Sequence, residues 1–544
     1  MRLLDRRIGL LFAIFFLLLL AAAGRAAWLG GVRAESLGER AAAQQVADLE
    51  VPARRGTITD RNGLELAVSE DAATVFANPF LVEDPVRAAA RLARVLDVPE
   101  DELLDQLSDD AGFVYLARQV DADMGDRVEE LGIAGVDTVP EPRRLYPQDE
   151  LASQLLGAVG TDGYGLAGLE QAYEQSLHGV DGRRRVVSDA LGEPLSIVES
   201  EQVEAGDDLQ LTIDAALQAR VESALAKVGE TYSPRGAHAI VLDPNTGEVL
   251  SLANWPAVDA NEWAEAPDGA RRNGAVSSSF EPGSTFKPFT VSGALEEEVV
   301  DPGTEFTLEP TIKVADRVIG EAHERGTVEL SVGEILAQSS NVGTVTIGME
   351  LGEERFDEWI RAFGFGAPTG VEAPGEAPGV VPPSEDYSGS SIGNLPIGQG
   401  LSVTPIQMVQ GYSAIANEGV MRTPYVVEGG ESEGRRVISE ETAADVSRML
   451  EGVLGPGGTA EEAQIAGYEL AGKTGTAEKA IDGVYSDTKF FASFVGFAPA
   501  EDPELLVSVM VDEPQGSYYG GTVAAPAFEE IVSFALPYLG IAPE

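Results

Sequence analysis

Three short segments decide the fold of this chain: Ser284-Thr285-Phe286-Lys287, Ser339-Ser340-Asn341 and Lys473-Thr474-Gly475-Thr476. Lysine is rare in the sequence, with only six residues against 31 arginines, and two of the six lie in these segments. A guanidinium group does not lose its proton in a protein, so a cationic side chain that has to act as a base must be lysine. The segments therefore predict a serine nucleophile, Ser284, served by a lysine base, Lys287.

We expect Ser284 and Lys287 on one helix. Glu281-Pro282-Gly283 breaks the chain just before the serine, which predicts a helix that begins near Ser284 and continues toward Leu295. Residues three apart on a helix share a face, so the lysine amine can reach the serine hydroxyl. This amine can take the hydroxyl proton if burial and a neighbouring cation lower its pKa. We expect Lys473 to be that neighbour.

The other residues of the second and third segments have expected roles in proton transfer and binding. Ser339 can pass a proton toward a leaving amine, and the Asn341 amide can bind both the lysine base and a substrate carbonyl. Gly475 is expected to leave room for a substrate backbone beside its strand. The backbone amides of Ser284 and Thr476 are the candidates for an oxyanion hole.

Two further matches to these patterns are excluded by their order. Ser486-Asp487-Thr488-Lys489 repeats the Ser-x-x-Lys spacing but follows Lys473, and Lys227-Val228-Gly229 precedes every candidate serine. A lone Ser-x-x-Lys is a weak signal, because most such pairs are surface residues of a helix. Three segments in a fixed order are a much stronger indication of one shared site.

Composition limits the class of protein. A chain of 544 residues with 44% hydrophobic content is globular and long enough for two or three domains. Its formal net charge of −53 argues against binding to nucleic acid. The sequence has no cysteine, which excludes disulfides and thiol catalysis, and His178, His238 and His323 lack the spacing of metal ligands. We therefore expect no metal and no other cofactor.

Residues 1–32 are predicted to be a membrane anchor. A basic N-terminal flank precedes the apolar run 8–23, which residues 26–32 can lengthen to a full span. A basic flank before an apolar segment places the remainder of the chain outside the cytoplasm. Cleavage of a signal peptide near Ala21-Ala22-Ala23 is the alternative.

The remaining chain divides into a helical stalk (33–50), a first extracytoplasmic region (51–205) and a second region (206–544). The elements expected in the first region are a turn at Asn62-Gly63, helices at 84–96 and 100–107, a helix that starts at Gly168, and a strand at 183–187. Those expected in the second are a helix over 215–227 with Asp214 as its N-cap, hairpins of 239–242 with 249–252 and of 490–497 with 505–511, and a final helix over 526–536 that Pro537 stops. Strands at both ends with helical sequence between them predict an α/β (α+β) domain, an antiparallel sheet flanked by helices.

From Arg54 almost to its C-terminus the chain resembles the class B penicillin-binding proteins, which are peptidoglycan D,D-transpeptidases. Segments that resemble the non-catalytic region of that family are Arg55–Gly63 and Gly168-Leu169-Glu170. Segments that resemble the lining of its catalytic cleft are Gly398-Gln399-Gly400, Thr404-Pro405 and Tyr519-Gly520-Gly521. Glu281–Ser284 and Ser339–Gly343 are more similar to the division (septal) branch than to the elongation branch.

The resemblance implies a fold and a reaction. The fold would be a penicillin-binding/serine β-lactamase-like transpeptidase domain, preceded by a non-catalytic pedestal or dimerisation domain. Ser284 would attack the penultimate D-Ala carbonyl of a stem pentapeptide, and an amine of a neighbouring stem would resolve the acyl-enzyme. Lys473, Thr474 and Thr476 would hold the terminal carboxylate of the donor, with Gly475 and Tyr519 also binding substrate. β-Lactam antibiotics would acylate the same serine.

The resemblance also implies partners and a location. The expected partners are a membrane glycan polymerase of the shape, elongation, division and sporulation class and other division proteins, with residues 51–205 as the docking pedestal. An uncleaved anchor would make the chain a single-pass protein of the plasma membrane, with its catalytic domain outside the cytoplasm.

Three rival interpretations remain open. A serine β-lactamase or penicillin sensor would share the fold, but no acidic residue has the spacing of a deacylation base, and residues 51–205 would be unexplained. A catalytically idle division scaffold would not need intact Ser284, Lys287 and Lys473. An elongation-type transpeptidase would use the same chemistry at a different cellular site.

Overall fold

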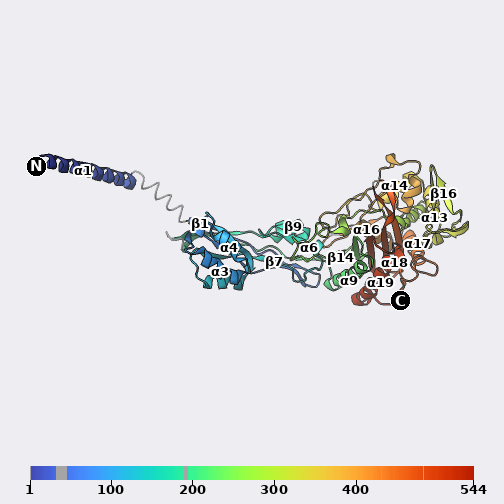
Figure 1. Ribbon diagram of the computed structural model, residues 1–544. Helices are drawn as coiled ribbons and strands as arrows, with labels where there is room; N and C mark the ends of the chain where they lie inside the picture. The colour runs from blue at the N-terminus through green and yellow to red at the C-terminus, as the bar shows by residue number, and fades with distance from the viewer. Residues whose placement is uncertain (1, 32–45, 189–193, 431, 482, 544) are drawn as a thin grey trace.

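The computed structural model describes residues 2–31, 46–188, 194–430, 432–481 and 483–543. Helix α1 (Arg2–Gly31) contains the apolar stretch Gly9–Leu29, 21 residues with a mean hydropathy of 2.3, which is long enough to cross a membrane. It is the one helix of that length and composition in the part of the chain that the structure describes. Figure 1 shows α1 at the N-terminal end, clear of the folded body.

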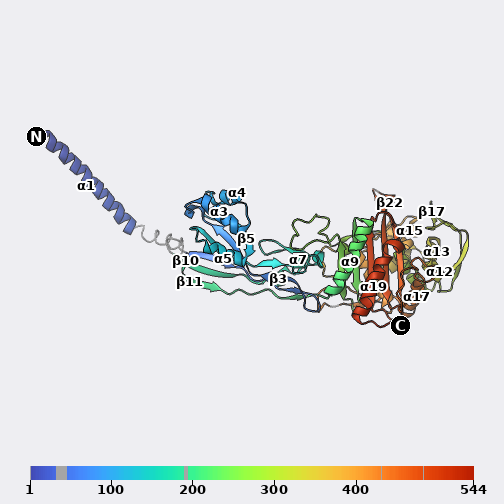
Figure 2. The same cartoon turned by 60° about the horizontal axis from the view of Figure 1, so that its bottom comes forward.

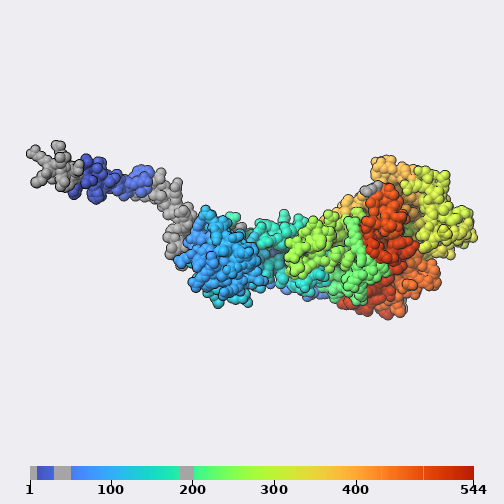
Figure 3. Space-filling view, viewed as in Figure 1, coloured from blue at the N-terminus to red at the C-terminus, as the bar shows by residue number. Residues whose placement is uncertain are grey.

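The folded body is elongated, with a smaller lobe toward α1 and a larger lobe at the far end (Figure 3). The smaller lobe has its own apolar core, in which Val75, Leu92 and Leu103 are completely buried. This core lies between an antiparallel sheet of order β5-β4-β6 and its helices. The elements are β4 (Ala72–Ala77), η1 (Pro79–Leu81), α3 (Pro85–Leu96), α4 (Glu100–Leu107), β5 (Val114–Asp121), α5 (Ala122–Glu130) and β6 (Val136–Pro140).

Narrow sheets and short helices run from beside the smaller lobe to the larger lobe, with β1 at the end nearest α1 (Figure 1). One sheet has the order β1-β10-β11, another β12-β2-β3-β7, and β8 pairs with β9. The strands are β1 (Val46–Val51), β2 (Ile58–Thr59), β3 (Glu65–Glu70), β7 (Arg143–Leu145), β8 (Ala158–Val159), β9 (Gly165–Ala167), β10 (Gly182–Ser188), β11 (Pro194–Glu201) and β12 (Leu209–Gln210). The helices are α6 (Ser153–Leu156), α7 (Gly168–Ala172) and α8 (Glu174–Leu177).

The larger lobe is organised around a five-stranded antiparallel sheet of order β14-β13-β23-β22-β21. Its strands are β13 (Gly236–Leu242), β14 (Val249–Trp255), β21 (Ala471–Ile481), β22 (Val484–Ala498) and β23 (Leu505–Asp512). Helices α9 (Ala215–Tyr232) and α19 (Ala525–Leu539) pack on each other and on this sheet (Figure 2). Helices α10 (Gly274–Ser277) and α16 (Pro405–Ala416) also pack against it. This is the predicted antiparallel sheet flanked by helices.

The remaining elements of the larger lobe complete its helical part. The helices are η2 (Gly283–Phe286), α11 (Lys287–Glu296), α12 (Val332–Ala337), α13 (Asn341–Leu351), α14 (Glu353–Ala362), η3 (Ser384–Asp386), α15 (Ser391–Asn394), η4 (Leu395–Ile397), α17 (Glu440–Glu451) and α18 (Gly520–Val523). Three two-stranded antiparallel sheets are formed by β15 (Glu305–Leu308) with β18 (Val328–Ser331), β16 (Thr311–Val314) with β17 (Arg317–Gly320), and β19 (Val420–Arg422) with β20 (Gly434–Arg436).

Local signals set the ends of several helices. Asp214 caps α9 by accepting from the amides of Ala216 and Leu217, as predicted, and Asp84 caps α3 in the same way. Thr404 and Gln407 form a capping box at the start of α16. The predicted helices at 84–96 and 100–107, the turn at Asn62-Gly63 and both predicted hairpins are confirmed, with β22 and β13 longer than expected.

Two sequence-based expectations are wrong in part. The helical stalk of residues 33–50 lies largely outside the described residues, and its described end, from Val46, is strand β1, because it pairs antiparallel with β10. Pro537 does not stop the last helix, which continues to Leu539. The helix ends at Gly540, whose φ of 79° lets the Ile541 amide turn back to the Leu536 carbonyl.

The two segments that resemble family motifs of the non-catalytic region meet at one buried carboxylate. Glu170, completely buried, accepts from Arg55 Nε at 2.5 Å and from Arg144 Nε at 2.7 Å. Both arginine side chains are almost fully buried, and Arg144 also donates to the Gly56 carbonyl at 2.7 Å. Arg55, Arg144 and Glu170 therefore form a structural clamp near the junction of the two lobes. The pairing of β2 with β12, just before the larger lobe begins, also belongs to this junction.

Candidate active site

Ser284 lies in the 3₁₀ helix η2, which leads directly into α11. Gly283 has a φ of 55°, a left-handed value that favours glycine, and Thr285 Oγ1 donates to the Pro282 carbonyl at 2.8 Å. This tight turn places the serine at the start of a helix, as the Pro-Gly break predicts. Phe286, fully buried, anchors the turn in the core.

Lys287 is completely buried, and its Nζ atom contacts the second segment. It donates to Ser339 O at 2.6 Å, to Ser339 Oγ at 3.2 Å and to Asn341 Oδ1 at 2.7 Å. Ser339 has a φ of 59°, an uncommon conformation for a residue with a side chain, and Asn341 is the first residue of α13 after the N-cap Ser340. The structure thus brings the first two segments together around one amine.

The third segment lies on β21, which is the edge strand of the five-stranded sheet and packs against η2. Lys473 is completely buried, and Thr476 Oγ1 accepts from the Gly520 amide at 3.0 Å. Thr474 Oγ1 shares a 2.7 Å hydrogen bond with Thr459 Oγ1. An edge strand keeps one row of backbone hydrogen-bonding groups for another chain, so an extended peptide can pair with β21.

Gly475 has a structural role besides the predicted one in substrate binding. A Cβ atom at this position would lie 2.3 Å from Ser493 Oγ, 2.9 Å from Thr285 Cγ2 and 3.0 Å from the Pro282 carbonyl oxygen. The space beside Gly475 is therefore filled by the protein itself. The missing side chain lets β21 approach the turn that carries Ser284.

Burial controls the charge of the two lysines. Burial lowers the pKa of Lys287 to about 7, against a smaller opposing effect of the Glu321 carboxylate. The pKa of Lys473 is well below its ordinary value. Burial is the larger cause, and the charge of Lys287 is the smaller one. Lys473 Nζ donates to the Thr474 carbonyl at 3.3 Å. Near neutral pH the site therefore holds at most one lysine charge, so that a neutral amine is available as a base.

Tyr519 lies at the rim of the site, beside α18. Its side chain is 43% exposed, and its ring centroid is 4.5 Å from that of Tyr518, which stacks on Phe490 at 4.0 Å. The next residue, Gly520, donates its amide to Thr476. The structure thus places an exposed aromatic group next to the third segment.

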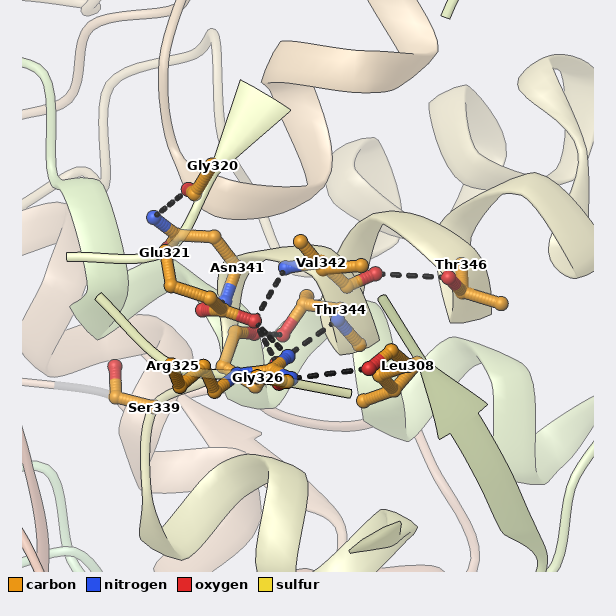
Figure 4. A network of polar contacts seen from close by, with 12 residues as sticks. Leu308, Gly320, Glu321, Arg325, Gly326, Ser339, Asn341, Val342, Thr344 and Thr346 are labelled. Atoms are coloured by element: carbon orange, nitrogen blue, oxygen red, sulfur yellow. Dashed lines mark hydrogen bonds and ion pairs between the residues drawn. The ribbon is translucent and has the colours of Figure 1, made fainter. Parts of the chain in front are cut away.

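Glu321, which the sequence analysis did not identify, holds the start of α13 (Figure 4). Its carboxylate accepts from Ser340 Oγ at 2.6 Å, from the Asn341 amide at 2.7 Å and from the Val342 amide at 3.3 Å. Arg325 forms an ion pair with the same carboxylate. Burial acts to raise the pKa of Glu321, but the hydrogen bonds from Ser340, Arg325 and Asn341 outweigh it and lower the pKa.

Glu281, three residues before Ser284, has no role predicted from the sequence. Its carboxylate accepts from Tyr485 Oη at 3.0 Å and from the Gly400 amide at 3.2 Å, and burial raises its pKa. It lines a cavity of about 690 Å³, together with Phe280, Phe491 and the end of β21. This cavity lies along residues 477–480 of β21, just beyond the third segment.

The lysines of the two excluded motif matches are paired with other residues. Ser486 and Lys489 are on β22, where residues three apart point to opposite faces, and Lys489 pairs with Glu513 at 3.1 Å. Lys227 is on α9 and pairs with Glu530 at 2.6 Å. Among the described residues there is no group of three or more His, Cys, Asp or Glu arranged to hold a metal ion.

Comparison with known families decides the affiliation. Residues 237–533 match the penicillin binding protein transpeptidase domain, and residues 50–211 match the penicillin-binding protein dimerisation domain. The chain belongs to the penicillin-binding protein family. Its two matched regions follow each other in the order that the sequence predicts, non-catalytic region first.

Individual penicillin-binding proteins match along most of the chain. It is 34% identical to the probable peptidoglycan D,D-transpeptidase PenA of Neisseria meningitidis, over 91% of this chain and 86% of the relative. It is also 34% identical to the peptidoglycan D,D-transpeptidase FtsI of Escherichia coli, over 98% of this chain and 91% of the relative. Penicillin binding protein 3 of Mycobacterium tuberculosis, solved in complex with aztreonam, is 30% identical with a TM-score of 0.71, over 91% of this chain and 98% of that chain. The predicted two-domain fold is confirmed.

Proposed function

We propose that this penicillin-binding protein is a division-type peptidoglycan D,D-transpeptidase that cross-links stem peptides through an acyl-enzyme on Ser284. One observation carries the proposal: the amine of Lys287 is buried, contacts Ser339 and Asn341, and lies in the same site as buried Lys473. The septal role rests on the motifs of the division branch, and the 34% identity to FtsI and PenA supports it. The elongation-type alternative has no comparable support.

In the proposed first step, the hydroxyl of Ser284 attacks the penultimate D-Ala carbonyl of a stem pentapeptide. Neutral Lys287 takes the hydroxyl proton, and the backbone amides of Ser284 and Thr476 stabilise the oxyanion. Ser339, within 3.2 Å of Lys287 Nζ, passes a proton to the departing D-Ala amine. An amine of a second stem then attacks the ester carbonyl and forms the cross-link. The amine gives up a proton, which returns to the Ser284 oxygen as the serine is released.

Through Lys473, the bound substrate would control the protonation state of the base, Lys287. The terminal carboxylate of the donor, bound by Lys473, Thr474 and Thr476, stabilises the charged form of Lys473. The charged Lys473 then disfavours a second ammonium group in the same buried site, so Lys287 stays neutral and ready to accept a proton. β-Lactams carry a carboxylate in the equivalent position and would acylate Ser284 by the same route.

The test is the intact mass of the protein in detergent during incubation with benzylpenicillin, for the wild type, Ser284→Ala and Ser486→Ala. Ser486 is the matched control, because it belongs to the other Ser-x-x-Lys match in the chain. We expect a single persistent adduct on the wild type and on Ser486→Ala, and none on Ser284→Ala. A rapid loss of the adduct with hydrolysed drug would indicate a β-lactamase, and no adduct at all would indicate an idle scaffold.

We further propose that α1 anchors the protein in the plasma membrane and that residues 51–205 dock a membrane glycan polymerase and other division proteins. The smaller lobe has half-exposed aromatic rings, Phe113 and Tyr115, 4.8 Å apart, with Arg118 over the second ring. Aromatic and arginine side chains of this kind are enriched in protein interfaces. Phe113→Glu should abolish co-purification of the polymerase, whereas Val380→Glu, on the exposed surface of the larger lobe, should not. Unchanged co-purification would refute this docking site.

A further inference from the structure

The β16–β17 hairpin ends in a carboxylate that faces the catalytic segments. Glu321 follows β17 directly, and its two carboxylate oxygens accept one hydroxyl and two backbone amides from residues 340–342. The first amides of an α-helix have no partner within the helix, and the helix dipole favours a negative charge there. Glu321 therefore satisfies the start of α13 from a separate part of the chain.

This contact reaches Lys287 through a single residue. The Asn341 amide donates to Glu321 at 2.7 Å, and the Asn341 side-chain oxygen accepts from Lys287 Nζ at 2.7 Å. The side-chain nitrogen of Asn341, Nδ2, donates to the Gly320 carbonyl at 3.1 Å. Residues 320 and 321 thus hold Asn341 by both its backbone and its side chain, which fixes the acceptor that Lys287 uses.

Glu321 also determines the local charge. The charged groups that face Lys287 are Lys473 on β21 and Glu321 on the loop after β17, with Arg325 paired to Glu321 on that loop. Glu321 supplies negative charge, and it acts to raise the pKa of Lys287 against burial. Without it, the lysine would face only cations, and its neutral form would be favoured at lower pH.

We propose that Glu321 is a positioning residue for the acylation of Ser284: it holds Asn341 against Lys287 and supplies the negative charge that Lys287 faces. The inference rests on the proposed function, because it assigns Lys287 as the base. A residue that only stabilised the fold would change the amount of active protein. A positioning residue with a charge should change both the limiting rate and its dependence on pH.

The experiment measures the rate of acylation by a fluorescent penicillin between pH 5 and about 10 for the wild type, Glu321→Gln, Glu321→Asp and Glu324→Gln. Glu324 is the matched control, an exposed acid three residues along the same loop. For Glu321→Gln we expect a limiting rate ~10- to 100-fold lower and a midpoint lower by about one pH unit. For Glu321→Asp the pH midpoint should stay at the wild-type value, because the carboxylate charge remains. The limiting rate should fall, because the shorter side chain holds residues 340–342 less well. Glu324→Gln should match the wild type in both.

A midpoint that Glu321→Gln leaves unchanged would overturn the proposal, even if the rate falls, since a purely structural role predicts that result. If Glu321→Gln does not fold, Arg325→Gln decides, because it removes the cation paired with Glu321: a midpoint above the wild-type value supports the proposal, and an unmoved midpoint refutes it. No acylation of the wild-type protein would refute the proposed function itself. The two failures are therefore distinguishable.

Discussion

Replacing Gly475 by alanine should slow acylation of Ser284 by pushing β21 away from the turn that carries the serine. The added Cβ would lie 2.9 Å from Thr285 Cγ2 and 3.0 Å from the Pro282 carbonyl oxygen. Ordinary contacts between such atoms are about 3.5 Å or longer, so the strand and the turn must separate by roughly 0.5 Å. The third neighbour, Ser493 Oγ at 2.3 Å, ends a side chain and can rotate.

A misplacement of about 1 Å can cost 100-fold in rate, so a shift of this size should slow acylation by ~10- to 100-fold. Overpacking should also lower the free energy of unfolding by about 1–3 kcal/mol. The assay is the second-order rate constant for acylation by a fluorescent penicillin. Gly303→Ala is the matched control, because its Cβ would meet nothing within 4 Å.

A second substitution separates two explanations for any loss. Thr285→Ser removes the Cγ2 neighbour of the new Cβ and keeps the hydroxyl that donates to Pro282, so the double variant Gly475→Ala/Thr285→Ser should recover part of the rate if internal packing is the cause. A loss that Thr285→Ser does not relieve would favour the sequence-based reason, a clash with substrate. A wild-type rate for Gly475→Ala would refute both explanations.

Two more predictions concern the protonation of the base and the clamp between the lobes. Because the pKa of Lys287 is about 7 and the neutral amine is the base, the acylation rate should rise with pH, reach half its maximum near pH 7 and then level off; a midpoint close to the ordinary lysine value would contradict the burial argument. Glu170→Gln leaves Arg144 buried beside a neutral amide, while Arg55 keeps its ion pair with Glu174, so it should lower the free energy of unfolding by about 3 kcal/mol. Denaturant titration measures this, and a loss below about 1 kcal/mol would show that the clamp is not structural.

Elements with local signals could be predicted from the sequence. The helix expected over residues 100–107 is α4, with the same ends, and the one expected over residues 84–96 is α3, with Asp84 as its cap. The cap of α3 and the apolar spacing of both helices lie within a dozen positions of the chain. The fold class followed from the order of such elements along the chain.

Contacts between distant segments could not be predicted in this way. Glu321 is 20 residues before the Asn341 amide that it binds, in a stretch with no motif, and one acid among 90 gives no signal by itself. The internal reason for Gly475 was likewise not predictable, because its neighbours Pro282 and Ser493 are brought to it only by the packing of η2 and β22 on β21. The sequence identified which residue types the chemistry needs, but not what holds them in place.

The burial of Lys287 and Lys473 explains why so much of the molecule converges on three short segments. A buried ammonium group without partners costs several kcal/mol, so the surrounding contacts must offset that cost. Lys287 has acceptors on Ser339 and Asn341, which Glu321 keeps in place from another part of the chain. Because these contacts come from α11, α13 and the β16–β17 hairpin, each held by its own packing, losing one should alter the protonation of the lysines before it unfolds the protein. Substitutions around the lysines should therefore affect the rate of acylation more than the stability of the fold.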